Sequence, residues 1–517
     1  MSSINTRKIV SGEDYDKKTL EGVMAVYEVA KAAYGPKSAN VSIESNYGDP
    51  ISSHDGVFNV DKVHLEEPTA NTAARRIVQA SKSTNVKAGD GTTAAVILAC
   101  HLYLEARKLV AAHTENRMQI ARQLRNVSTK VIEQIDKLKK PATDELLEEV
   151  AVISASDEAT GRMLADTIKE VGEYGGIVIE NFAGAGLYND IVEGFYFRKG
   201  FTEANLINDP SNLESRFENV AILLTERRIQ TVTDVAIILD KILDKEIREL
   251  VIVGTVEPEA LATLIKNRLG GVITVSVVDS PVFGSLRTLF FDDLAMYTGA
   301  KVLSPGANPD DFDIEMLGEG KVVMNEFSTT ILNGDGDRAG LEKRVKELEA
   351  ELAVAESAVT QDALRERLGR LKGKIAIVKV GGATEVEQKE IKLRVEDAIC
   401  AVQAAMKEGV VPGGGVTLAR TEVEGDFADV FKFPFKVLME NAGLNSEKYL
   451  GKVLEAKPWE GYDLREDDPQ LKDLLKAGVI DPALVIKEVV KNATSVAAEL
   501  IKTTIDLPLA DRENKRG

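Results

Sequence analysis

The chain has 517 residues, 44% of them hydrophobic, and a formal net charge of −19 at pH 7. This length predicts two to four domains, and the acidic balance excludes a general nucleic-acid or membrane-surface binder, because both kinds of protein need a clustered basic surface. Only two cysteines occur and no run approaches the roughly 20 apolar residues of a membrane span, so we expect a cytoplasmic protein with neither a disulfide framework nor a membrane partner.

The N-terminal part of the chain, up to Pro141, is predicted to be a helical core with one small β-hairpin. Apolar residues recur at helical spacing in residues 17–33, 70–83, 92–109 and 118–138. Gly35-Pro36 ends the first of these helices. Two β-prone runs, residues 41–44 and 58–63, flank Asp55-Gly56, a pair that favours a hairpin turn.

Further along the chain the pattern changes twice. Between residues 175 and 281, predicted strands (177–180, 219–224, 250–253 and 272–278) alternate with predicted helices (237–243 and 260–269), which indicates a separate α/β domain. Residues 341–371 are predicted to be a charged helical pair joined near Thr360, and residues 385–408 a helix that ends at Gly409. The remainder returns to helices, and residues 510–517 are predicted to be a disordered tail.

One glycine-rich string could bind phosphate. Gly89-Asp90-Gly91-Thr92-Thr93 directly precedes an apolar helix, so its N–H groups and hydroxyls would lie at a helix N-terminus, where anions bind well, and Asp90 could hold a magnesium ion. The same string also serves as an ordinary N-cap and turn, and Tyr34-Gly35-Pro36-Lys37 as a simple helix stop. The chain has neither a P-loop nor a strand-borne Gly-x-Gly-x-x-Gly string, so familiar nucleotide motifs are absent.

Three other candidates have ordinary explanations as well. Asp55-Gly56 is explained by a hairpin turn, and Asp397 by a solvated acid that lies off the apolar stripe of its helix. Gly413-Gly414-Gly415 needs unusual backbone angles or a close approach, but a flexible hinge would use the same residues. Each string alone therefore leaves the function open.

Taken in order and over nearly the whole chain, these strings resemble the group I chaperonins of the GroEL type. They include Val395-Glu396-Asp397-Ala398 and Glu408-Gly-Val-Val-Pro-Gly-Gly-Gly-Val416 besides the strings above. The resemblance implies a multidomain fold of α and α/β type. It consists of a mainly helical equatorial ATPase domain (residues 1–139 and 409–517), a small intermediate domain (140–193 and 374–408) and an α/β apical domain (194–373).

The resemblance also implies an ATPase cycle that uses ATP and Mg²⁺, and it leaves a need for K⁺ open. The residues that it implies around the nucleotide are Tyr34, Gly35, Pro36, Gly89, Asp90, Gly91, Thr92, Thr93, Gly414 and Asp481, with Asp90 on magnesium. Asp55 and Asp397 would position the attacking water. Because Asp397 belongs to the intermediate domain, it would reach the nucleotide only when that domain closes, with hinges at Pro141 and Gly409 and at Gly194 and Gly373.

The partners implied by the resemblance are copies of the chain and non-native polypeptides. The chain would form a homo-oligomer of heptameric rings, single or double, and a GroES-type co-chaperonin stays open. Apolar apical residues would bind the polypeptides, namely Phe201, Leu206, Leu239, Leu261 and Ile265. Ala33, His54 and Ala94 depart from the family pattern near the nucleotide, as do Glu203 and Lys266 in the apical region. Two alternatives remain: a holding protein that keeps the ring without productive cycling, and a small-molecule kinase that would be a monomer or dimer.

Overall fold

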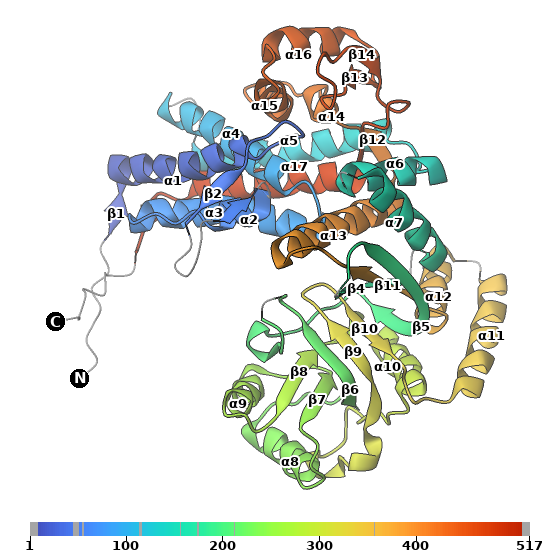
Figure 1. Cartoon of the computed structure of the whole chain (residues 1–517). Helices are drawn as coiled ribbons and strands as arrows, with labels where there is room; N and C mark the ends of the chain where they lie inside the picture. The colour runs from blue at the N-terminus through green and yellow to red at the C-terminus, as the bar shows by residue number, and fades with distance from the viewer. Residues whose placement is uncertain are drawn as a thin grey trace. The chain divides into compact units, whose positions relative to one another are not determined.

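A computed structural model describes residues 9–44, 51–53, 56–112, 116–155, 157–172, 175–182, 184–210, 212–355 and 357–508 (Figure 1). The chain folds into two compact units. The first, which we call the helical unit, comprises Met1–Ala165 and Leu393–Gly517, so that both ends of the chain belong to it. The second, the sheet unit, is the continuous segment Asp166–Lys392. Within the described residues no helix is long and apolar enough to cross a membrane.

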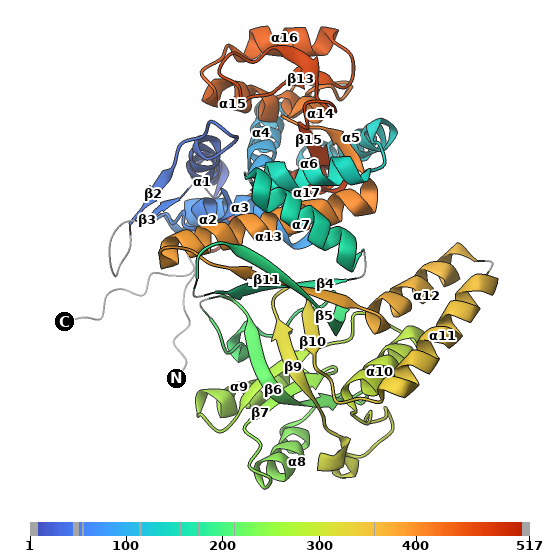
Figure 2. The same cartoon turned by 45° about the vertical axis from the view of Figure 1, so that its right-hand side comes forward.

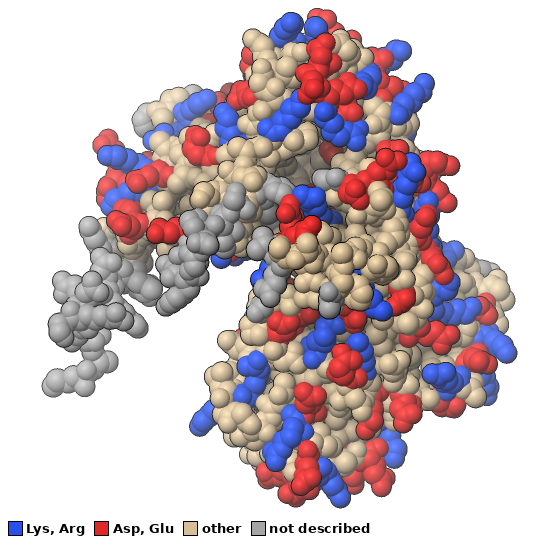
Figure 3. All heavy atoms as spheres, in the orientation of Figure 1, with Lys and Arg blue, Asp and Glu red and all other residues tan. Residues whose placement is uncertain are grey.

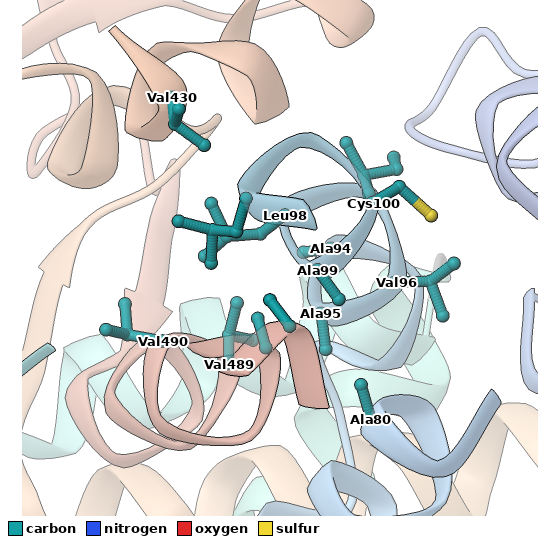
Figure 4. Packing of buried hydrophobic residues seen from close by; sticks show 14 of the residues in the cluster. Ala80, Ala94, Ala95, Val96, Leu98, Ala99, Cys100, Val430, Val489 and Val490 are labelled. Carbon is teal, nitrogen blue, oxygen red and sulfur yellow. The ribbon is translucent and has the colours of Figure 1, made fainter. Parts of the chain in front are cut away.

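Long helices form the core of the helical unit. They are α1 (Gly12–Ala32), α3 (Pro68–Ala88), α4 (Thr92–Ala111), α5 (Arg117–Leu138) and α17 (Ala483–Lys502). The last helix, α17, lies against α3, α4 and α5, although these come from the opposite end of the chain. Figure 4 shows why the approach is close: Ala94, Ala95 and Ala99 of α4 face Val489 and Val490 of α17 across the core, and small residues let two helices pack tightly.

Shorter elements complete the helical unit. The helices are α2 (Gly56–Asp61), α6 (Asp144–Ala155), α7 (Glu158–Val171), α13 (Glu385–Glu408), α14 (Val416–Ala419), α15 (Phe433–Asn441) and α16 (Ser446–Glu455), with α7 and α13 running on into the sheet unit. Four two-stranded ribbons pair β1 (Val10–Ser11) with β16 (Ile505–Asp506), β2 (Val41–Ile43) with β3 (Ile51–Ser53), β12 (Val410–Pro412) with β15 (Ile480–Pro482), and β13 (Glu460–Tyr462) with β14 (Leu471–Asp473).

The sheet unit is built on one eight-stranded mixed sheet (Figure 2). Its order is β4 (Gly176–Asn181), β11 (Lys374–Val380), β5 (Leu187–Phe197), β10 (Thr329–Leu332), β9 (Gly318–Met324), β6 (Ser215–Leu224), β7 (Glu249–Val253) and β8 (Thr274–Val278). Parallel pairing joins β4 to β11 and β6 to β7 to β8, and the other neighbours are antiparallel. Near its β4 end the sheet therefore combines strands from the beginning and the end of the unit.

Helices pack on both faces of this sheet. Along β7, Val251 and Val253 join a core with α10 (Ser285–Thr298), whereas Leu250 and Ile252 join a second core with α8 (Val232–Leu243) and α9 (Pro258–Leu269). Neighbouring residues of a strand point to opposite faces, so a continuous apolar run serves both cores. Helices α11 (Arg338–Val354) and α12 (Ala358–Leu371) form the antiparallel pair before β11.

The predicted fold class is confirmed, since a mainly helical unit accompanies an α/β unit, and most predicted helices and strands occur near their expected bounds. One local prediction is wrong. Residues 58–63 do not form the second hairpin strand. Ile51–Ser53 pairs with β2 instead, and Gly56–Asp61 is a helix with Val60 fully buried. A run of six residues is too short for the spacing of its apolar side chains to separate a strand from a helical turn. The predicted helical pair is present as α11 and α12, and its junction lies between Val354 and Ala358, close to the expected Thr360. Residues 510–517 lie outside the described part of the chain.

Candidate active site

The predicted phosphate-binding string forms a tight loop between α3 and α4, and residues 89–91 are called the phosphate loop after that prediction. Gly89 and Gly91 both have left-handed backbone conformations, with φ of 67° and 76°, which glycine adopts without steric cost. Gly91 is the N-cap of α4, and no side chain caps this helix. The first N–H groups of α4, at Thr92 and Thr93, therefore point out of the helix end without a side-chain acceptor, and the positive end of the helix dipole adds to their attraction for an anion.

Neighbouring segments pack closely around this loop. A methyl group on Gly91 would lie 2.6 Å from Val485 Cγ1 of α17, and one on Gly56 would lie 3.0 Å from the Cβ of Thr93. The start of α2 therefore lies directly beside the first turn of α4. Asp55 immediately precedes α2 but falls outside the described residues. The structure thus brings Gly56 to the phosphate loop at the start of a helix.

A second glycine turn, Gly413-Gly414-Gly415, leads from β12 into α14. Gly414 and Gly415 have φ of 63° and 74°, and the Gly413 N–H donates to the carbonyl of Val479 at 2.9 Å. A methyl group on Gly414 would lie 3.6 Å from the backbone oxygen of Tyr462. In the same ribbon, Val411 of β12 pairs with Asp481 of β15. This pairing carries Asp481 to the turn, directly before α17, which packs against α4.

The two acids of the site influence each other. Burial raises the pKa of Asp481 to about 7, and the charge of Asp90 acts in the same direction. Burial also raises the pKa of Asp90, against the opposing effect of the Gly91 N–H, which donates to its carboxylate at 2.5 Å. Burial and the charges of both acids raise the pKa of the Tyr34 hydroxyl. The structure therefore brings Tyr34, Asp90 and Asp481 within electrostatic reach of one another.

Two acids that repel one another and resist ionisation form a site that a cation would stabilise. Among the described residues, no lysine or arginine lowers the pKa of Asp90 or Asp481. A divalent cation that arrives with an anionic ligand would neutralise both carboxylates, and oxygen donors are the ligands that Mg²⁺ prefers. No cluster of three or more His, Cys, Asp or Glu side chains able to hold a metal occurs within the described ranges. Water and ligand oxygens would have to complete the coordination.

The glycine-proline turn after α1 is held by contacts that the sequence did not reveal. Asn441 of α15 donates from its amide to the carbonyls of Lys31, at 2.8 Å, and Tyr34, at 2.7 Å. Lys37 donates to the carbonyl of Glu466 at 2.7 Å. Gly35 has φ of 96° and lies against Leu438 of α15, whereas Pro36 is exposed. Lys37 is part of the Tyr34-Gly35-Pro36-Lys37 string of the sequence analysis. No local sequence pattern connects Asn441 with this turn, which lies about 400 residues earlier.

Helix α13 carries Asp397 as an exposed residue, as its position off the apolar stripe predicts. Cys400 follows three residues later, on the same side of the helix. Cys400 contacts the phosphate loop: a methyl group on Gly89 would lie 2.5 Å from its Sγ. The face of α13 that carries Asp397 and Cys400 therefore lies against the loop that carries Asp90.

The residues predicted to bind polypeptides divide into two groups. Leu206 and Leu239 are core residues in the cluster beneath α8 and α9, with only 1% and 5% of their surface exposed. Phe201, Leu261 and Ile265 are half-buried and pack against the cores from outside. In this conformation only the second group offers apolar surface, because helical spacing alone cannot tell an inward leucine from one at the edge of the buried face.

The sequence model of the TCP-1/cpn60 chaperonin family matches residues 26–505. The chain belongs to the TCP-1/cpn60 chaperonin family. It is accordingly an ATP-dependent folding chaperone of the ring-forming type and an ATPase. ATP is therefore the ligand that the site has to accommodate.

Two crystal structures of the chaperonin gp146 from the bacteriophage EL 2 (Pseudomonas aeruginosa), both in the presence of ATP-BeFx, share this fold. Crystal form II superimposes with a TM-score of 0.76 at 19% sequence identity, covering 98% of this chain and 100% of that one. Crystal form I gives a TM-score of 0.64 at 18% identity, covering 98% and 99%. The chaperonin fold thus extends over essentially the whole chain, in a divergent sequence.

Proposed function

We propose that the loop between α3 and α4 binds the phosphates of ATP with Mg²⁺ and that hydrolysis there drives a folding cycle. The observation that carries the proposal is the uncapped N-terminus of α4, reached through Gly89 and Gly91, with Asp90 and Asp481 beside it. Backbone N–H groups and the hydroxyls of Thr92 and Thr93 would bind phosphate oxygens. Tyr34, Gly35, Pro36 and Gly414 would enclose the rest of the nucleotide.

Asp90 would hold Mg²⁺, whose chemistry is to neutralise charge on the phosphates as the terminal bond breaks. Asp55 and Asp397 would orient the attacking water, a task for which ordinary ionised carboxylates suffice. Asp397 is suited to this role because its helix contacts the phosphate loop and its side chain is exposed. The family resemblance leaves a requirement for K⁺ open, and the proposal assigns no residue to this ion.

The coupling of ATP hydrolysis to domain movement depends on where the chain is divided into domains. We propose an equatorial domain of residues 1–139 and 409–517, an intermediate domain of 140–193 and 374–408, and an apical domain of 194–373. Gly409 has φ of 83° and lies next to the bridge between Lys140 and Val410. The Gly194 N–H donates to the carbonyl of Gly373 at 2.9 Å, so both chain crossings occur side by side at the proposed upper boundary. Rotation at these glycines would move Asp397 toward or away from the nucleotide.

Client binding and assembly complete the proposal. Phe201, Leu261 and Ile265, together with the more exposed Val232 and Leu269, would present apolar surface to non-native polypeptides. The ribbons β1–β16 and β2–β3 each contain only two strands, and such isolated ribbons are marginal unless another strand pairs with an edge. Pairing between copies would satisfy these edges. The family resemblance supports rings of seven subunits and leaves a GroES-type co-chaperonin open, and a cytoplasmic location belongs to the same expectation.

Activity and assembly test this function together. Purified chain should release phosphate from ATP only with Mg²⁺, and Asp397→Ala should reduce kcat strongly while nucleotide binding persists. Light scattering on a sizing column should give the mass of one ring or of two. Refolding of a denatured enzyme would separate a folding chaperone from a holding protein. A chain that hydrolyses ATP equally well with Asp397→Ala would contradict the proposed site.

A further inference from the structure

Helix α13 meets the phosphate loop where Cys400 faces Gly89. A methyl group on residue 89 would lie 2.5 Å from the sulfur of Cys400 and 3.5 Å from its Cα atom. The sulfur distance is shorter than non-bonded atoms tolerate, and the Cα distance shows that the backbone of α13 itself approaches the loop. The contact therefore depends both on the absence of a side chain at residue 89 and on a small side chain at residue 400.

In the conformation described, the helix has little freedom to relieve pressure at this contact. Val395, Ala398, Ala401, Val402 and Ala405 of α13 are all fully buried, so the opposite side of the helix is packed into a core. Close-packed interiors respond to added volume by shifting backbone or forcing side chains off their rotamers. A larger residue at position 400 would consequently push the helix away from Gly89 and leave the buried stripe to slide or tilt.

Asp397 lies on the same helix, three residues before Cys400. A rise of about 1.5 Å per residue places the two Cα atoms within one turn of each other along the axis, on the same side. A shift of the helix at residue 400 is therefore transmitted to the carboxylate of Asp397. Misplacement of a reacting group by about 1 Å can reduce a rate by about a hundredfold.

We infer that Cys400 is a positioning residue, whose small side chain fits against Gly89 and sets the distance between Asp397 and the phosphate loop. The inference rests on the proposed function, because it assumes that Asp397 acts on the nucleotide. It assigns Cys400 a steric role in hydrolysis and no contact with the substrate. The sulfur is not required for this role, but its volume is limited by Gly89.

The experiment compares size variants at position 400 in the full-length chain. Cys400→Ala and Cys400→Ser should keep kcat within about threefold of the original, whereas Cys400→Leu should lower kcat by about tenfold to a hundredfold. KM and nucleotide affinity should stay within about twofold in all three, since the loop, Tyr34 and Gly414 are unchanged. Lys407→Leu places the same leucine side chain at an exposed position of the same helix, without adding volume at Gly89, and should leave kcat unchanged.

Asp397→Ala is measured in parallel, so that the two ideas fail separately. If Asp397→Ala keeps its activity, the proposed function is wrong. If Asp397→Ala is inactive but Cys400→Leu retains the original kcat, the positioning role is wrong. An equal loss of affinity and kcat in Cys400→Leu would also overturn it, because that result indicates general damage to the site.

Thiol labelling provides a second measurement in case Cys400→Leu does not assemble. Cys100 is fully buried in α4 and burial raises its pKa, so a maleimide should react with the half-buried Cys400 alone. The labelled protein should bind nucleotide but turn over at least about tenfold more slowly, and Cys400→Ala treated in the same way should be unaffected. Full turnover by stoichiometrically labelled protein would refute the inference.

Discussion

Replacing Gly91 by alanine tests whether the phosphate loop is fixed by close packing as well as by its backbone conformation. Alanine in the left-handed region costs about 1–2 kcal/mol. The added methyl group would also lie 2.6 Å from Val485 Cγ1 and 2.8 Å from Val489 Cγ2, and overpacking of this kind costs about 1–3 kcal/mol more. We therefore expect Gly91→Ala to lose about 2–5 kcal/mol of unfolding free energy in total.

Gly443 provides the matched control, since its φ of 73° is nearly the same but no atom lies within 4 Å of the methyl position. Gly443→Ala should lose only the backbone contribution, about 1–2 kcal/mol, and keep its ATPase activity. The assays are urea denaturation without nucleotide and steady-state phosphate release. Adding Val489→Ala to Gly91→Ala should restore part of the stability, with a coupling energy of about 1 kcal/mol or more in a double-mutant cycle. Equal losses at both glycines and zero coupling would refute the packing argument.

Three further predictions concern charge and positioning. Burial lowers the pKa of His101 from 6.5 to about 4. The stability of the neutral form is present above pH 6.5 and lost on acidification, so the free energy of unfolding measured in urea should fall by about 2 kcal/mol between pH 7 and 5. His101→Phe should remove this dependence, whereas a change at the exposed His64 should not. The pKa of Asp481 is raised from 3.8 to about 7, so ionisation of this acid destabilises the nucleotide-free protein as the pH rises from 4 to 7. Asp481→Asn should therefore increase the free energy of unfolding at pH 8 by up to about 4 kcal/mol and weaken Mg-nucleotide binding in calorimetry. Unchanged stability would contradict the assigned burial. Asn441→Ala removes two hydrogen bonds to the turn before Gly35 and should raise the nucleotide Kd about three- to tenfold, and an unaltered Kd would show that the turn does not depend on it.

The sequence predicted best what depends on local periodicity. The helices around residues 17–33, 92–109 and 385–408 are long, and their apolar spacing persists over several turns, so the pattern has little ambiguity. The glycine strings were also informative, because left-handed backbone at Gly89 and Gly91 is a local property. The resemblance to the chaperonins added the chain-wide order of these strings. Together these signals placed the glycine string at residues 89–91 between two helices, and the structure has it between α3 and α4.

Contacts between distant parts of the chain could not be predicted in this way. The run at residues 58–63 begins with alternating apolar and polar side chains, as a strand does, but residues 56–61 pack as a helix against α1, α3 and α4. Leu206 and Leu239 have the same composition as surface-binding leucines, but the packing of α8 and α9 on the sheet buries them. The pairing of Val411 with Asp481 and the bonds from Asn441 to the turn join segments with no shared sequence signal. Each depends on tertiary structure.

Three glycines at or beside the phosphate loop explain how segments far apart in the sequence can be held at fixed positions around it. At Gly56, Gly89 and Gly91 the backbone is approached by a side chain from another segment, namely Thr93, Cys400 and Val485. Each contact excludes even one methyl group, so the loop can occupy its position only when α2, α13 and α17 are all packed around it. Since α13 also carries Asp397, a conformational change that moves this helix changes the phosphate loop and the proposed water-positioning carboxylate together. Hydrolysis would then follow the packing state of the whole helical unit, which is what a chaperonin cycle requires of its ATPase.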